Sequence, residues 1–118
     1  METQNISPYY APGVQSIDEI IADTFGVTVE GMKDIGRKRE NVDARHFAMW
    51  FRINNSRDSF AKIGSIYGGR DHATVYHAQK KVIALMDTDP RYRDMALEAL
   101  EKLENAGHLK KKTKKIAI

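Results

Sequence analysis

Three side chains at the start of a predicted helix have the chemistry needed to recognise a polar surface. A carboxylate can accept hydrogen bonds, an imidazole can donate them, and a methyl group offers apolar contact. Such groups at a helix N-terminus can reach the base edges in the major groove of duplex DNA. The alternative is an ordinary helix cap followed by a solvated face. The three residues are Asp71, His72 and Ala73.

The helix that carries these side chains is predicted to span about residues 72–86, because apolar residues recur there every three to four positions. The residues predicted to be buried are Val75, Ala78, Val82 and Met86. Three residues lie on the opposite side of the helix: Ala73, His77 and Lys80, at about 160°, 200° and 140° from Val75. This outward face places small and hydrogen-bonding groups first and a cation behind them. A recognition helix is expected to have this order, with groups that contact bases first and a cation that neutralises phosphate behind them.

A second, shorter helix is predicted just upstream, over residues 60–67, with Ser59 as its N-terminal cap. Gly68-Gly69 lies between the two helices and can adopt the left-handed backbone conformation of a tight turn. Two helices joined in this way have the proportions of a helix-turn-helix. Arg70 and His77 are expected to buttress the turn and the helix packing rather than to contact bases.

The other segments are also predicted to be helical, because capping residues and glycines separate apolar runs of helical spacing. Ser16 and Glu19 form a capping box for the first helix, and Asp89 caps the last, with Pro90 at its first position. Thr28 and Asp71 are expected to cap the helices that begin directly after them. No segment alternates as a strand would, so the predicted fold class is all-α with about six helices. The other expected helices span residues 17–25, 29–34, a third from Asn41 or Asp43 to about 53, and 90–106, with a basic polar loop over residues 37–40.

Three aromatic residues are expected to pack rather than to stack on a ligand. Trp50 is predicted at the edge of the buried face of the third helix. Tyr67 and Tyr76 are predicted to be half-buried. The buried face of the third helix is predicted to consist of Ala44, Phe47, Ala48 and Phe51.

The chain has 118 residues and a formal net charge of +3, and it contains no cysteine. This length is enough for one domain with a hydrophobic core. The lack of cysteine excludes a disulfide scaffold, a thiolate zinc site and a cysteine nucleophile. No apolar run reaches the length of about 18 residues that a membrane span needs. We expect a flexible N-terminal arm over residues 1–15, a folded domain over residues 16–107 and a basic tail over residues 108–118.

The charge is distributed unevenly along the chain. Residues 36–57 carry a net charge of +4 and residues 60–81 carry +3, whereas residues 1–35 carry −5 and residues 82–109 carry −3. If the two basic blocks share one face, the molecule suits a polyanionic partner. The lysines of the tail either add DNA affinity or keep the chain soluble.

Residues 68–78 read Gly-Gly-Arg-Asp-His-Ala-Thr-Val-Tyr-His-Ala. This string resembles the signature of the C-terminal DNA-binding domain, domain IV, of the bacterial chromosomal replication initiator DnaA, which reads Gly-Gly-Arg-Asp-His-(Thr/Ser/Ala)-Thr-Val-x-His-Ala. The resemblance extends upstream through residues 62–64 and 45–49 to the capped helix at Ser16, and covers roughly residues 16–86. It implies a Trp-repressor-like helix-turn-helix that binds double-stranded DNA at a DnaA-box-like site.

The resemblance also implies roles for individual residues. Arg37 matches an arginine that enters the minor groove, and the positions that contact bases in the major groove are matched by Asp71, His72 and Ala73. Many members have threonine where Ala73 stands, although its methyl group can still pack on a thymine methyl. Phe60 and Ala61 stand where the family often has Leu-Pro beside a base. The residues expected to contact the DNA backbone are Lys38, Arg39, Arg45, His46, Thr74 and Lys80.

No cofactor or metal ion is expected, and the chain is not expected to be an enzyme. His72 and His77 lie about 140° apart around one helix, so they cannot hold one metal ion together. The chain has no Gly-x-x-x-x-Gly-Lys-(Ser/Thr) motif, so the resemblance covers DNA recognition without the ATPase domain of the family. We expect a module that is monomeric when free and works in the bacterial cytoplasm, at the nucleoid. The Met1 start and the arm favour a chain that stands alone.

Other functions are also compatible with these residues. The acidic first and last helices could bind a protein partner, such as a full-length replication initiator or a regulatory protein. The chain could equally be a transcription regulator or a mobile-element protein. RNA is a poorer fit, because a recognition helix with an arginine loop suits the grooves of B-form DNA better than those of A-form RNA.

Overall fold

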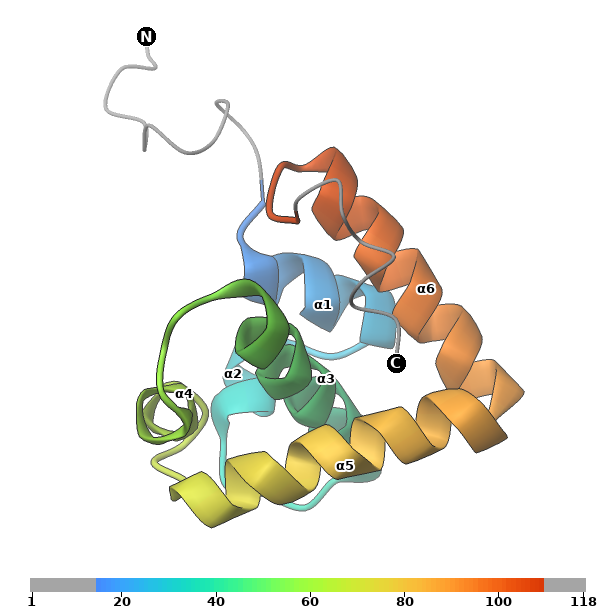
Figure 1. The fold of residues 1–118 in the computed structure, drawn as a ribbon. Coiled ribbons are helices and arrows are strands. Elements are labelled where there is room, and N and C mark those ends of the chain that lie inside the picture. Colours follow the sequence, from blue (N-terminus) through green and yellow to red (C-terminus); the bar gives the residue numbers. More distant parts are fainter. Residues whose placement is uncertain (1–14, 110–118) are drawn as a thin grey trace, which may run out of the picture.

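The computed structural model describes residues 15–109, which form six helices and contain no strand in that range (Figure 1). This confirms the all-α fold class. Most of the expected arm and tail lies outside the described residues. None of the helices in residues 15–109 combines the length and the apolar character needed to cross a membrane. The helices are α1 (Ile17–Phe25), α2 (Val29–Lys33), α3 (Arg39–Asn55), α4 (Phe60–Ile66), α5 (His72–Thr88) and α6 (Pro90–Asn105).

Side-chain caps begin five of the six helices, as the sequence predicts. The capping box of α1 is complete: the Ser16 hydroxyl accepts from the Glu19 N–H, and the Glu19 carboxylate accepts from the Ser16 N–H. Each cap satisfies a first-turn N–H that has no partner within its helix. The other capping residues are Thr28, Ser59, Asp71 and Asp89, for α2, α4, α5 and α6.

Helix α3 lies at the centre of the fold and is buried on nearly every side. It packs against α1, α2, α4 and α5, which leaves it little solvent-facing surface over its middle turns. Trp50 is therefore 2 % exposed and packs against the ring of Phe47, so its expected place at the edge of the buried face is wrong. The buried apolar residues of α3 are Ala44, Phe47, Ala48, Met49, Trp50 and Phe51.

The start of α3 also differs from the expected one. The helix begins at Arg39, with Lys38 as an N-cap that makes no side-chain hydrogen bond, rather than at Asn41 or Asp43. The Val42 N–H donates to the Lys38 carbonyl at 3.0 Å, so helical hydrogen bonding starts here without a side-chain cap. Arg39 and Glu40 consequently belong to the helix, and the basic loop shortens to the residues before them.

The two C-terminal helices close the core as expected. All four residues predicted to be buried on α5 are buried, and α6 packs across α1 and α5 through Tyr92, Ala96, Ala99 and Leu103 (Figure 1). Gly107, with φ of +88°, ends α6 in a Schellman motif in which the His108 N–H donates to the Leu103 carbonyl. Leu109 beyond it is also buried and belongs to the hydrophobic core.

A buried polar cluster, which the sequence does not predict, joins α1, α3 and the end of α4. Tyr67, fully buried rather than half-buried, donates its hydroxyl hydrogen to Asp18, 2.5 Å away. The Arg52 guanidinium donates to the Tyr67 hydroxyl at 2.7 Å and to the Asp18 carboxylate at 3.3 Å. The Lys33 ammonium group forms an ion pair with the same carboxylate at 3.5 Å. These bonds fix the last residue before the Gly68-Gly69 turn against the core.

Candidate nucleic-acid interface

The turn between α4 and α5 depends on three glycines. Gly68 and Gly69 have φ of +88° and +71°, in the left-handed region where side chains are strained. Gly64 permits the closest approach: its carbonyl accepts from the Arg70 N–H at 2.9 Å, and a Cβ on it would lie 2.0 Å from the Arg70 carbonyl oxygen. The backbone of α4 therefore touches the backbone just before α5, which sets the angle at which α5 leaves the turn.

The first residues of α5 project into solvent. Asp71, His72 and Ala73 are exposed, and Thr74 is half-buried. Asp71 accepts the Thr74 N–H at 3.0 Å, and this bond lowers the pKa of the Asp71 carboxyl below its usual value. The carboxylate is thus ionised at neutral pH and caps the helix while facing outward. The structure brings together the four residues that the sequence singles out, at one helix tip.

The outward face of α5 continues with exposed residues at His77 and Lys80. Tyr76 is 46 % exposed, contrary to the expectation that it packs half-buried. Its position on the helix places it beside Lys80, whose ammonium group lies 5.3 Å from the ring centroid and 3.4 Å from the hydroxyl. His77 contacts the Tyr76 ring instead of buttressing the fold, so its expected packing role is not seen.

Arg37 and Lys38 lie in the loop between α2 and α3. Both are exposed, and neither side chain forms a hydrogen bond or ion pair with another residue in the range 15–109. Cations in this state can contact DNA without first breaking a bond within the protein.

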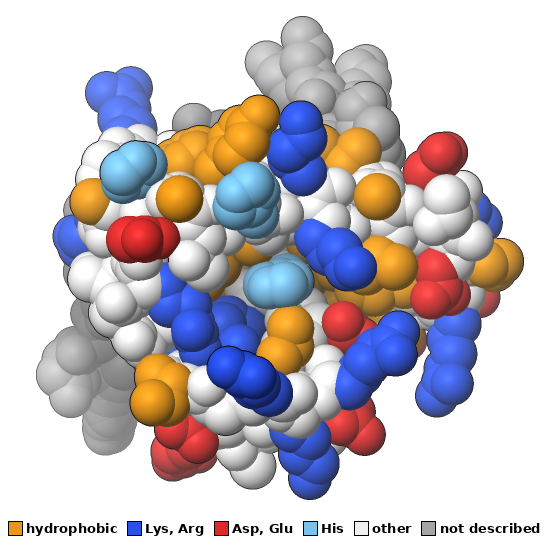
Figure 2. Space-filling model, turned by 90° about the horizontal axis from the view of Figure 1, so that it is seen from below, with side chains coloured by type: hydrophobic (Ala, Val, Ile, Leu, Met, Phe, Trp, Pro, Cys, Tyr) orange, Lys and Arg blue, Asp and Glu red, His pale blue; other side chains and the backbone are white. Residues whose placement is uncertain are grey.

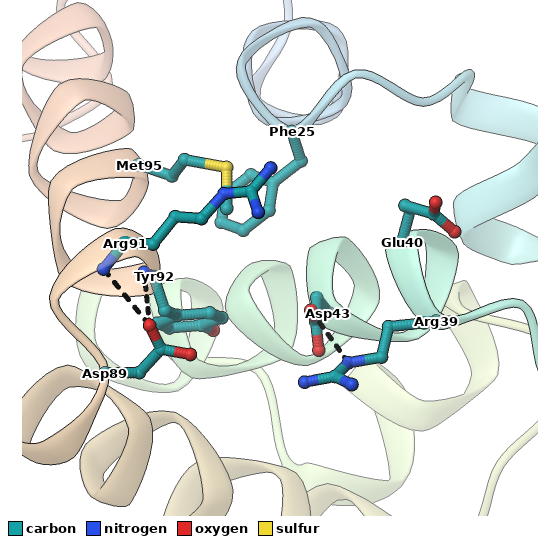
Figure 3. A pocket seen from close by; sticks show the side chains of 8 residues that line it. All are labelled: Phe25, Arg39, Glu40, Asp43, Asp89, Arg91, Tyr92 and Met95. Carbon is teal, nitrogen blue, oxygen red and sulfur yellow. Dashed lines mark hydrogen bonds and ion pairs between the residues drawn. The ribbon is translucent and has the colours of Figure 1, made fainter.

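Arg39, the first residue of α3, is exposed and forms an ion pair within its own helix. Its Nε lies 3.7 Å from the Asp43 carboxylate, one turn further along α3. Figure 3 shows both side chains in a cavity of about 350 Å³ between the ends of α1, α3 and α6, where Phe25 and Tyr92 form the apolar wall.

Arg45 is 3 % exposed, unlike a residue that contacts phosphate. Its guanidinium donates to three backbone carbonyls, those of Met32 at 2.8 Å, Asp34 at 2.7 Å and Gly36 at 3.2 Å. Burial of a charged group is tolerated when hydrogen bonds satisfy it, as they do here. In this structure Arg45 shapes the basic loop from inside, so it is not among the DNA contacts that we propose.

His46 is half-buried beside several cations. Burial, with Arg45, Lys81 and Arg70 nearby, lowers the pKa of the His46 imidazole to about 4. The ring is therefore neutral at pH 7. A neutral ring can donate one N–H to a phosphate but adds no positive charge.

The low pKa of His46 predicts a loss of stability in mild acid. The unfolded chain takes up this proton near the ordinary pKa of 6.5, whereas the folded chain takes it up only near 4. The contribution of His46 is full above pH 6.5 and is lost progressively down to about pH 4, by about 1–2 kcal/mol because the ring keeps some solvent contact. Urea unfolding of wild type and His46→Gln between pH 7 and 4 measures this. If the two profiles run parallel, His46 is not the group responsible.

Phe60 and Ala61 form the start of α4. Phe60 is half-buried and packs against the core, whereas Ala61 is exposed. Only Ala61 therefore presents its side chain freely on the surface.

Basic and imidazole side chains gather on the face along which α5 runs. Figure 2 shows this face, with histidine and Lys or Arg side chains over its left and centre and most acidic side chains towards its right and lower edges. No group of three or more histidine or acidic side chains within residues 15–109 could hold a metal ion. The arrangement is that of an anion-binding surface built around a helix tip.

The fold and this surface define a helix-turn-helix protein, with α5 in the position of the recognition helix. Residues 14–82 match the family model described as bacterial DnaA protein helix-turn-helix. The chain belongs to this family. The match includes the loop, the turn and the first two-thirds of α5, and it ends before α6.

Relatives of the chain are chromosomal replication initiator proteins DnaA. The protein from Flavobacterium psychrophilum is 38% identical over 90 residues, which are 76% of this chain and 19% of the relative. The Ehrlichia ruminantium protein is 38% identical over 81 residues, 69% of this chain and 18% of the relative. The Lacticaseibacillus casei protein is 34% identical over 94 residues, 80% of this chain and 21% of the relative. The chain thus spans about a fifth of the length of these relatives.

Proposed function

We propose that the chain binds double-stranded DNA in a sequence-specific manner, at a site resembling a DnaA box. The observation that carries the proposal is the exposed tip of α5, where Asp71, His72 and Ala73 project from a helix-turn-helix of this family. Asp71 would accept from a base amino group, His72 would donate to a base or phosphate oxygen, and Ala73 would pack on a thymine methyl.

The remaining contacts would position the protein on the duplex. Arg37 would enter the minor groove next to the major groove that α5 occupies, and the loop residue Lys38 would follow the phosphates. Thr74, His46, Lys80 and Arg39 would contact the backbone from α5 and α3. Ala61 is exposed at the start of α4 and would lie beside a base, whereas the core packing of Phe60 leaves Phe60 a supporting role. No catalytic step, cofactor or metal ion is part of this proposal.

The exposure and charge of these side chains support DNA over a protein partner. The outward face of α5 and the loop offer cations and hydrogen-bonding groups, with Ile35 and Tyr76 as the large apolar side chains exposed there. Protein interfaces are built around a larger apolar centre. We further propose that the chain is monomeric when free, and that it acts at the nucleoid in the bacterial cytoplasm.

The test is selection from a random duplex library, followed by binding to the selected site across a salt series. We expect one enriched motif. If about six phosphates are neutralised, the logarithm of the binding constant should fall with the logarithm of salt concentration with a slope of about −5. Recovery of no motif, at salt concentrations where the protein still binds DNA, would overturn specific readout.

A role in replication initiation or its regulation rests on the relatives, which are replication initiators. Mapping the sites that the chain occupies in cells tests this role. Occupancy concentrated at a replication origin is expected. Occupancy of promoters without the origin would favour the alternative, a transcription regulator that uses similar sites.

A further inference from the structure

The backbone carbonyl of Asp34 is shared by two arginines from different parts of the fold. Arg45, from α3, donates to it through Nη2 at 2.7 Å. Arg70, the residue just before the cap of α5, donates to it through Nη2 at 3.1 Å. One carbonyl oxygen has two lone pairs and can accept both bonds. Through this oxygen, the basic loop is bonded to the core helix and to the helix-turn-helix at one point.

The turn and the loop are also in direct contact. A Cβ placed on Gly68 would lie 2.8 Å from the Lys33 carbonyl oxygen and 3.6 Å from the Ile35 side chain. The backbone of the turn therefore rests against the residues that flank Asp34. Arg45 bonds the Gly36 carbonyl as well, which leaves little freedom to the chain immediately before Arg37.

The position of Arg70 in the fold has an unfavourable contribution to stability. Its Nε is buried and has no hydrogen-bond partner within the described residues. A buried donor without a partner is unfavourable, and native structures contain few of them. Stability alone therefore gives a poor reason for an arginine at this position, whereas a bond that spans two DNA-reading elements gives a specific one.

From this geometry we infer that Arg70 is a positioning residue that couples the recognition helix to the minor-groove loop. Arg70 directly precedes Asp71 in the chain, and Arg37 follows Asp34 by three residues. The bond from Arg70 to Asp34 thus sets the distance between the tip of α5 and the Arg37 side chain. The inference rests on the proposed function. It adds that the protein holds its two groove-binding elements, the tip of α5 and the Arg37 side chain, at a fixed distance from each other.

The test is a double-mutant cycle with Arg70→Met and Arg37→Ala, measured on the selected duplex. Arg70→Met should weaken binding by roughly tenfold, as loss of one hydrogen bond from a charged donor would. If Arg70 acts through Arg37, the double variant should bind within about threefold of Arg37→Ala alone, since the two losses are not additive. In Arg70→Met, base-pair substitutions at the positions that Arg37 contacts should no longer change the affinity. Substitutions at the positions that His72 contacts should still lower it.

Two controls separate positioning from loss of charge. Lys102→Met removes a cation on α6 that bonds Thr24 of α1, and it should leave affinity nearly unchanged. Lys80→Met should reduce the magnitude of the salt slope by about 0.9, whereas Arg70→Met should change the slope no more than Arg37→Ala does, because Arg70 would act on the DNA only through Arg37.

Arg70→Lys keeps the charge and one donor, and it should recover part of the affinity. If Arg70→Met is too unstable to measure, Arg70→Lys replaces it in the double-mutant cycle. Two results would overturn the coupling while leaving specific DNA binding intact. One is that the affinity losses of the Arg37 and Arg70 variants are fully additive. The other is that Arg70→Met weakens base discrimination equally at the positions that Arg37 and His72 contact. Failure of the wild-type chain to select any motif would instead refute the proposed function.

Discussion

Gly64→Ala is expected to destabilise the folded chain by about 3 kcal/mol or more, because the new methyl group cannot be accommodated without moving backbone. The Cβ would lie 2.0 Å from the Arg70 carbonyl oxygen and 3.3 Å from a methyl group of Val75. The nearest atom belongs to the backbone of the turn, so a change of side-chain rotamer cannot relieve the clash. Either α4 and α5 separate, or the bond between the Arg70 N–H and the Gly64 carbonyl breaks.

Thermal unfolding followed by circular dichroism measures this effect. For a domain of this size, a loss of about 3 kcal/mol corresponds to a Tm lower by about 15 °C. Gly36→Ala is the matched control, because the closest atom to a Cβ there is a side-chain oxygen at 3.7 Å, an ordinary contact. Equal Tm values for Gly64→Ala and Gly36→Ala would show that the backbones of the turn and α4 are not in close contact.

His72→Ala is expected to have the largest effect on specific binding among variants that leave the fold intact. Its side chain is exposed at the tip of α5 and has no hydrogen-bond partner within residues 15–109, so its removal costs the protein little stability. If it donates to a base, the loss should be about 1–3 kcal/mol of binding free energy, and discrimination at that base position should relax.

His77→Ala is a matched control, since His77 is also an exposed histidine of α5 but lies more than one turn further from the tip. Binding of both variants to the selected duplex and to single-base substitutions of it measures the difference. We expect His77→Ala to keep the base preferences of the wild type. If both variants change only the salt dependence, the tip of α5 does not read bases.

Local features of the chain determined where most helices begin and which faces they bury. Ser16, Thr28, Ser59 and Asp71 cap helices because hydrogen bonds to the N–H groups of a helix's own first turn need no partner from elsewhere in the chain. The buried stripe of α5 follows from its spacing alone. The same locality explains why the residues at the tip of α5 could be identified as candidates from the sequence alone.

Features that depend on contacts between distant segments were not predictable in this way. The sequence indicates an amphipathic third helix, whereas four neighbouring helices bury Trp50 as well. Tyr67 and Asp18 are 49 positions apart, and no local spacing relates them. The start of α3 at Arg39 was missed because no side-chain cap marks it.

The sequence by itself determined the caps, the glycine turn and the eleven-residue string at the tip of α5, since each depends on neighbouring residues along the chain. Only the tertiary structure decided what the arginines do. Arg37 is exposed and without a partner in the described chain, whereas Arg45 is buried on three carbonyls and Arg70 bonds the loop to the turn. A guanidinium has the same charge in each place, and its role follows from the oxygens that the fold brings within reach of it.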